Sequence, residues 1–186
     1  MKLLLLSLFG LGLPGFVLAA GNPSESYMRI YAFGVSTSPF CTTPIWLFDS
    51  ATPREVNMFD GPALGGGDIP DGTYQCVIMK MSDSLRFKPA SNDGTACVAG
   101  TSYNLDVCRA GTTGRNPNDN SSISCTGNTL NAVGTDTVYV FLSTTSTNTA
   151  GSGTNAFLPP ATTNDATQGM RLDSPFVVNG SSSGQF

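Results

Sequence analysis

The feature that most limits the fold of this chain is a series of short strand-like segments separated by turn-forming residues. Gly, Pro, Asn and Asp concentrate between segments in which β-branched, aromatic and other apolar residues alternate or cluster. We find no capped window with the helical period of apolar positions. The pattern predicts an all-β fold, a single antiparallel β-sandwich. Its expected strands are residues 27–35, 45–49, 55–59, 73–81, 84–88, 103–108, 137–143 and 175–178.

The first residues of the chain have the pattern of a secretory signal. MKLLLLSLFGLGLPGFVLAA contains one basic residue, and its apolar run is too short and too interrupted by Gly and Pro to span a bilayer. Val17-Leu18-Ala19 matches a signal-peptidase site, and no lipid-accepting cysteine follows it. We therefore expect cleavage of residues 1–19, in preference to a membrane anchor, and no membrane insertion afterwards.

The remainder of the chain divides by composition into two parts. Residues 20–142 contain most of the strand-like segments and are expected to form the sandwich core. Residues 143–186 are rich in Ser, Thr, Asn and Gly, which predicts a long mobile loop followed by a terminal strand.

The charge of the chain argues against two classes of partner. Charged residues make up 12% of the sequence, compared with about 25% in typical globular proteins. Because Lys2 leaves with the signal, 8 of the 9 basic residues remain against 13 acidic ones, a net charge of −5. Nucleic acids and anionic lipids both favour clustered Lys and Arg, so neither is an expected partner.

All five cysteines follow the signal, so they would meet the oxidising conditions under which disulfides persist. They are Cys41, Cys76, Cys97, Cys108 and Cys125, with no CxxC motif, and two bridges with one free thiol are the simplest interpretation. We favour a bridge from Cys108 to Cys125, which would close a polar loop over residues 109–124.

Strand periodicity limits the pairing of the other cysteines. In TYQCVIMKM, Cys76 shares a face with Tyr74 and Ile78, whereas in YNLDVC Cys108 lies on the face of Asn104 and Asp106. Those faces are expected to oppose each other, so Cys76 and Cys108 should not pair. Cys41, Cys76 and Cys97 would then share one bridge, with a buried Cys76 expected to be the free thiol.

A Gly-rich stretch, GGGDIPDGTY, separates two strand-like segments. Asp68 and Pro70 follow Gly65, Gly66 and Gly67, and no lysine stands at phosphate-loop spacing, so the glycines are interpreted as a flexible connection.

The order of segments over this part of the chain resembles prealbumin-like (transthyretin-like) sandwiches. It consists of a strand ending IWLF, a short hairpin to EVNMF, the Gly-rich link, and PDGTY at the start of a long strand. Carboxypeptidase regulatory-like modules, with their pGxY turn, are among these sandwiches. The resemblance covers residues 27–88 and implies a scaffold or interaction module. The strand pattern alone also fits an immunoglobulin-like sandwich.

Several catalytic chemistries are excluded because the chain contains no histidine. Ser-His-Asp and Cys-His catalysis and His-ligated metals all require one. GSSSG, residues 180–184, matches a nucleophile elbow formally but follows only a brief strand and has no base. A pair of carboxylates across a cleft would suffice for a glycosidase. The candidates by type are Asp49, Glu55, Asp60, Asp68, Asp71, Asp83 and Asp106.

Two further patterns are compatible with ligand binding. NPNDNSS, residues 116–122, offers oxygen atoms to Ca²⁺ but contains one carboxylate, so an Asn-rich turn is the simpler interpretation. Trp46 and Tyr31 would contact sugar rings if they were exposed, but packing in the core or between sheets is the favoured explanation of them.

The sequence therefore favours an exported, non-catalytic β-sandwich without a cofactor or metal. Its expected role is structural, adhesive or protein-binding, at the cell surface or in the periplasm, with another protein or a surface polysaccharide as partner. A carbohydrate-binding module is the first alternative, and a carboxylate-based hydrolase is the second.

Overall fold

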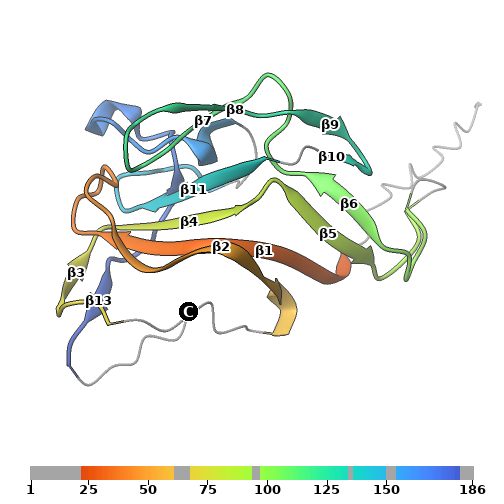
Figure 1. Cartoon of the computed structure of the whole chain (residues 1–186), viewed down its shortest axis with the longest axis horizontal. Coiled ribbons are helices and arrows are strands. Elements are labelled where there is room, and N and C mark those ends of the chain that lie inside the picture. The colour runs from red at the N-terminus through yellow and green to blue at the C-terminus, as the bar shows by residue number, and fades with distance from the viewer. Residues whose placement is uncertain (1–21, 61–67, 94–96, 134–135, 150–153, 181–186) are drawn as a thin grey trace, which may run out of the picture.

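A computed structural model describes residues 22–60, 68–93, 97–133, 136–149 and 154–180 (Figure 1). The expected signal peptide, residues 1–19, and Gly65–Gly67 lie outside these ranges, as does most of GSSSG. Within the described ranges the protein is all-β, as predicted, and contains 3-10 turns but no α-helix. The elements are β1 Pro23–Ser36, β2 Ile45–Asn57, η1 Met58–Asp60, β3 Gly72–Tyr74, β4 Cys76–Ser82, β5 Ser84–Pro89, β6 Tyr103–Asp106, β7 Thr113–Arg115, β8 Ser122–Ser124, β9 Gly127–Thr129, β10 Ala132–Val133, β11 Thr137–Ser143, η2 Thr154–Phe157, η3 Thr163–Asp165, β12 Met170–Arg171 and β13 Phe176–Val178.

The largest sheet is organised around β1. One edge of β1 pairs with β2, and the opposite edge pairs first with β5 and then with β4. β4 and β5 therefore act as one long strand that is interrupted at Asp83. Beyond that strand, β11 adds to β4 and β6 adds to β5. β11 and β6 thus diverge at Asp83, which we call the junction (Figure 1).

The hairpin predicted between IWLF and EVNMF is not formed. Both segments belong to β2 and pair with β1, since Arg54 lies opposite Ile30 and Asp49 opposite Ala32. Residues 50–53 bulge outward between these pairs. Pro53 has no N–H for a ladder hydrogen bond, and the bulge places it where none is needed.

The predicted strand 73–81 is divided at Gln75. Its first part, β3, leaves the large sheet and pairs with β13, with Tyr74 opposite Phe176. Its second part, β4, pairs with β1 and β11. Tyr74 therefore does not share the packing environment of Cys76, contrary to the expectation from strict alternation.

The long loop predicted near the C-terminus is packed in its described parts. β12 pairs in parallel with β11, so the sheet is mixed, and η2 contacts β11 and β7. Phe157 of η2 is buried in the core. The polar stretch 109–124 likewise contains the β7–β8 hairpin, whose Ile123 packs on the core.

Both faces of β4 and β11 are buried, which explains their nearly continuous apolar sequences. Ile78 and Phe141 lie on one face, with Tyr139, Cys41 and Cys76. The other face carries Val77 and Val140, and it continues into residues packed under β13 and η2. The β7–β8 hairpin and the β3–β13 strand pair pack against these two faces, so neither face of β4 and β11 is left to solvent.

Candidate functional site

Two disulfides form, Cys41–Cys76 and Cys108–Cys125, with Cα atoms 5.3 and 5.5 Å apart. The preferred bridge from Cys108 to Cys125 is confirmed, and so is the exclusion of Cys76–Cys108. The expectation of a free Cys76 is wrong, because the free thiol belongs to the half-buried Cys97. Cys76 is buried, as expected, but the loop that covers it contains Cys41, so burial brings the two sulfur atoms together in a disulfide.

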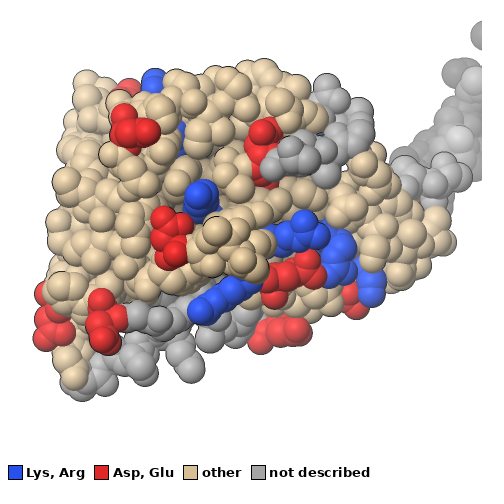
Figure 2. Space-filling view, in the orientation of Figure 1, with Lys and Arg blue, Asp and Glu red and all other residues tan. Residues whose placement is uncertain are grey.

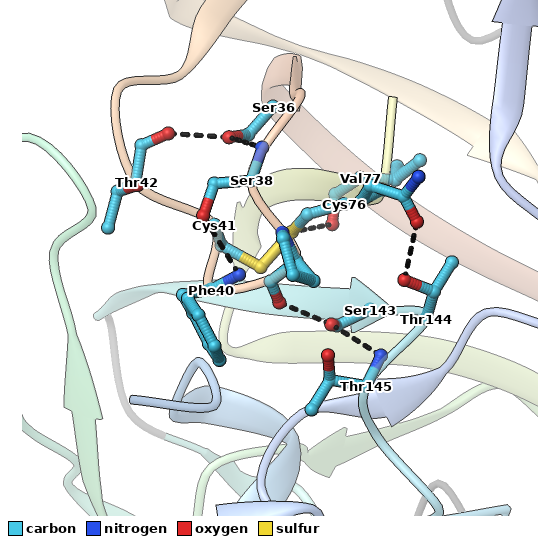
Figure 3. Close-up of a disulfide and its surroundings, with 12 residues drawn as sticks. Ser36, Ser38, Phe40, Cys41, Thr42, Cys76, Val77, Ser143, Thr144 and Thr145 are labelled. Atoms are coloured by element: carbon cyan, nitrogen blue, oxygen red, sulfur yellow. Dashed lines mark hydrogen bonds between the residues drawn. A yellow bond between two sulfur atoms is a disulfide. The ribbon is translucent and has the colours of Figure 1, made fainter. Parts of the chain in front are cut away.

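The Cys41–Cys76 disulfide fixes the loop of residues 37–44, which joins β1 to β2 (Figure 3). In the sheet, Ser36 of β1 and Ser143 of β11 lie on either side of Cys76. The Ser36 hydroxyl donates to the carbonyl of Thr42 over 2.5 Å, and the Ser143 hydroxyl donates to that of Pro39. One covalent bond and two hydrogen bonds from adjacent strands therefore hold this loop.

The backbone of loop 37–44 adopts an unfavourable conformation on both sides of Thr42. Cys41 and Thr43 have φ values of 58° and 50°, in the left-handed region that β-branched residues avoid. Such conformations persist only where the surroundings enforce them, and they concentrate at functional sites. Thr42 and Thr43 are exposed. The loop is thus a fixed, uncharged, hydroxyl-bearing surface. The sequence has no local signal for it, because Ser36 and Ser143 come next to Cys76 only through strand pairing.

Trp46 is a packing residue in this structure. Its ring lies so close to Gly34 that a Cβ there would be 2.7 Å from Trp46 Cε3. The indole N–H donates to Asn118 Oδ1 over 3.2 Å, and the ring is 6.2 Å from that of Tyr139. The indole is therefore held between the sheet and the β7–β8 turn.

Tyr31 lies apart from Trp46. It is the extra residue of β1 between Ile30 and Ala32, where the register shifts against both β2 and β4, whereas Trp46 lies opposite Gly34. Three residues of strand span about 10 Å. The two aromatic residues named from the sequence do not form one platform.

The Asn-rich turn 116–122 uses its oxygen atoms within the protein. Asn116 Oδ1 and Asp119 Oδ1 accept backbone N–H groups of Asn118 and Ser121, and Asn118 Oδ1 accepts the indole of Trp46. This supports the interpretation as a turn. Within the described ranges no group of three or more His, Cys, Asp or Glu residues is arranged to hold a metal ion.

Of the seven carboxylates named from the sequence, the structure brings together Asp83 and Asp106. Both are almost completely buried, at 0% and 2% exposure, whereas the other five are exposed. Burial is the largest influence on Asp83 and raises its pKa from 3.8 to about 7; the Cys108 amide lowers the pKa, and Asp106 raises it. A glycosidase needs its carboxyl groups on either side of a substrate cleft. This pair lies inside the protein, where no sugar reaches it.

Most described basic residues on the β1–β2–β5 surface are neutralised by neighbouring acids. Glu55 binds both Arg29 and Arg86, at 3.2 and 2.5 Å, and Lys88 binds Glu25 at 2.9 Å. Hydrogen bonding from Arg86 is the main cause of a lowered pKa at Glu55. Figure 2 shows basic and acidic groups next to each other on this side of the molecule. This is not the single-sign surface that a polyanion requires.

The described part of the chain is a disulfide-stabilised all-β protein in which none of the helices is long and apolar enough to cross a membrane. No family model, curated protein or solved structure matches the sequence.

Proposed function

We propose that this protein is an exported, non-catalytic β domain that binds another protein at the cell surface or in the periplasm. Its two disulfides fit an oxidising compartment, where such bonds persist. The absence of histidine from the sequence and the burial of the Asp83–Asp106 pair support a non-catalytic role.

The proposed binding role rests on the fixed conformation of loop 37–44. Binding by a flexible loop loses affinity to the entropy of ordering it, and a loop that is already fixed avoids most of that cost. The Cys41–Cys76 bridge and the hydroxyls of Ser36 and Ser143 provide this fixation. The loop keeps an unfavourable backbone conformation at Cys41 and Thr43, which hydrophobic burial of the sheet alone does not require.

A photo-reactive benzoylphenylalanine at Thr42 tests this role in the cells that make the protein. Irradiation should give a discrete cross-linked adduct, because Thr42 is exposed at the centre of the fixed loop. Thr52, exposed in the outward bulge of β2, is the matched control and should give none. Equal labelling at both positions, or no adduct at Thr42, would contradict the proposal that this loop is the binding surface.

A glycan array separates this proposal from a carbohydrate-binding module. We expect no saturable binding, because the Trp46 ring is packed on Gly34 and its N–H is already hydrogen-bonded. Saturable sugar binding that is lost in Trp46→Ala or Tyr31→Ala would contradict the protein-binding role and identify a carbohydrate-binding module.

If the protein is exported, its N-terminal signal should be removed. Cleavage after Val17-Leu18-Ala19 should leave mature protein that begins at Ala20 and is recovered without the membrane fraction. Mass spectrometry of the natural protein measures this directly. An intact Met1 terminus in membranes would contradict export with cleavage while leaving loop 37–44 to be tested on its own.

A further inference from the structure

Asp83 joins three parts of the fold at the junction. Its N–H donates to the carbonyl of Asp136, just before β11, over 2.9 Å, and its carbonyl accepts the N–H of Val107, just after β6, over 2.8 Å. Its side-chain Oδ1 accepts the N–H of Cys108 over 2.5 Å. One residue therefore connects the β4–β5 strand to β11 and to the disulfide-bonded segment that follows β6.

The second carboxyl at the junction, that of Asp106, is buried without a hydrogen-bond donor. Asp106 lies at the end of β6, opposite Ser84, so its buried carboxyl is a close neighbour of Asp83 and raises the pKa of that residue. Neither Asp106 oxygen, nor Asp83 Oδ2, has a hydrogen-bond partner within the described residues. Neighbouring carboxyl groups that lack other donors can hydrogen-bond to each other only when one of them carries a proton.

The charged groups around the pair add no compensating positive charge. Asp136 is a third acid beside it, and its Oδ2 accepts the N–H and hydroxyl of Thr126. None of the ion pairs in the described ranges includes these three acids. The basic residues on adjoining elements are engaged elsewhere or point to solvent: Lys80 lies over Tyr139, Arg86 binds Glu55, Lys88 binds Glu25, and Arg109 is exposed.

We propose that Asp83 and Asp106 share a single proton, and that loss of this proton as the pH rises through neutrality loosens β6 and the Cys108–Cys125 segment from the junction. The proton passes to solvent and leaves two buried negative charges with the Cys108 N–H as their donor. Two buried like charges with so few donors are strongly unfavourable, so water must enter. Asp106 ends β6, and Val107 and Cys108 after it are hydrogen-bonded to Asp83, so these are the contacts that the two charges would disturb.

The direction of the pH effect follows from the pKa of Asp83. Burial raises this pKa from 3.8 to about 7, so between these values the folded protein holds a proton that the unfolded chain has released. The stabilisation is complete below about pH 4 and is lost as the pH rises through about 7. Within that window the folding equilibrium constant falls by up to roughly tenfold per pH unit from this group.

The test combines carboxyl ¹³C titration by NMR with thermal unfolding across the same pH range. In the wild-type protein we expect one carboxyl of the pair to titrate near neutrality, and amide exchange at Val107 and Cys108 to rise above its intrinsic pH dependence there. Asp83→Asn and Asp106→Asn should each abolish the fall in thermal stability, because an amide can donate a hydrogen bond to the remaining carboxylate and does not titrate in this pH range. Asp173→Asn is the matched control and should keep the wild-type profile, since the Asp173 side chain is 80% exposed.

Three results would overturn the proposal. Titration of both carboxyls of the wild-type protein below about pH 5, within the ordinary range for Asp, would show that no proton is shared at neutral pH. Stability that is constant or increases towards pH 8 would have the wrong sign. Stabilisation at pH 8 by Ca²⁺, absent from both Asn variants, would assign the pair to a cation. The titration of the wild-type protein decides the question even if a variant fails to fold.

Discussion

Replacing Cys41 and Cys76 together by serine is expected to lower the free energy of unfolding by about 4 kcal/mol. The bridge joins residues 35 apart in sequence, and closing a loop of that length removes roughly this much conformational free energy from the unfolded chain. The loss is a large fraction of the 5–15 kcal/mol that typically stabilises a domain. Urea unfolding of the oxidised protein measures it.

The other cysteines provide the controls for this measurement. Cys108→Ser with Cys125→Ser opens a separation of 17 and should cost about 3 kcal/mol. Cys97→Ser removes a half-buried free thiol, and the expected change is within about 0.5 kcal/mol. A greater loss at Cys97 than at either bridge would mean that the disulfides contribute little to the stability of the native state.

Phe141→Ala is expected to destabilise the protein by about 3–5 kcal/mol, through lost burial and the cavity that remains. Phe141 is completely buried on β11 and packs with Ile78, Tyr139 and the Cys41–Cys76 disulfide. Neighbours on β4 and β11 and a covalently fixed loop restrict collapse into the space, which places the expected value in the upper part of that range. Chemical denaturation at constant pH gives the comparison.

Phe59→Ala is the matched control for this core substitution. Phe59 lies in η1 and is 58% exposed, so its removal should change the free energy of unfolding by less than about 0.5 kcal/mol. Comparable losses at Phe59 and Phe141 would contradict the division between core and surface described above.

Strand periodicity and turn chemistry identified much of the fold from the sequence. The segments around β1, β4, β5, β6 and β11 were recognised because alternating or clustered apolar residues and their flanking Gly, Pro and Asn lie close together in the chain. The Cys108–Cys125 bridge was predicted for the same reason, since it closes a short polar stretch. Both serines that hold loop 37–44 went unnoticed, because a single serine beside a strand has no distinctive local pattern.

Partnerships across longer distances required the tertiary structure. The interpretation of Cys76 as the free thiol failed because alternation gives the face of a residue but not what covers that face. Likewise, Asp83 and Asp106 were two of seven equivalent carboxylates until β5 and β6 paired and buried them together.

By itself the sequence determined the all-β class, the exclusion of histidine chemistry and the bridge between Cys108 and Cys125. Each depends on composition or on residues close together along the chain. Only the tertiary structure decided the Cys41–Cys76 bridge, the division of segment 73–81 between two sheets, and the acid pair at the junction. These depend on which strands become neighbours and in what register, and that choice is set by burial of both faces of β4 and β11, a property of the whole chain.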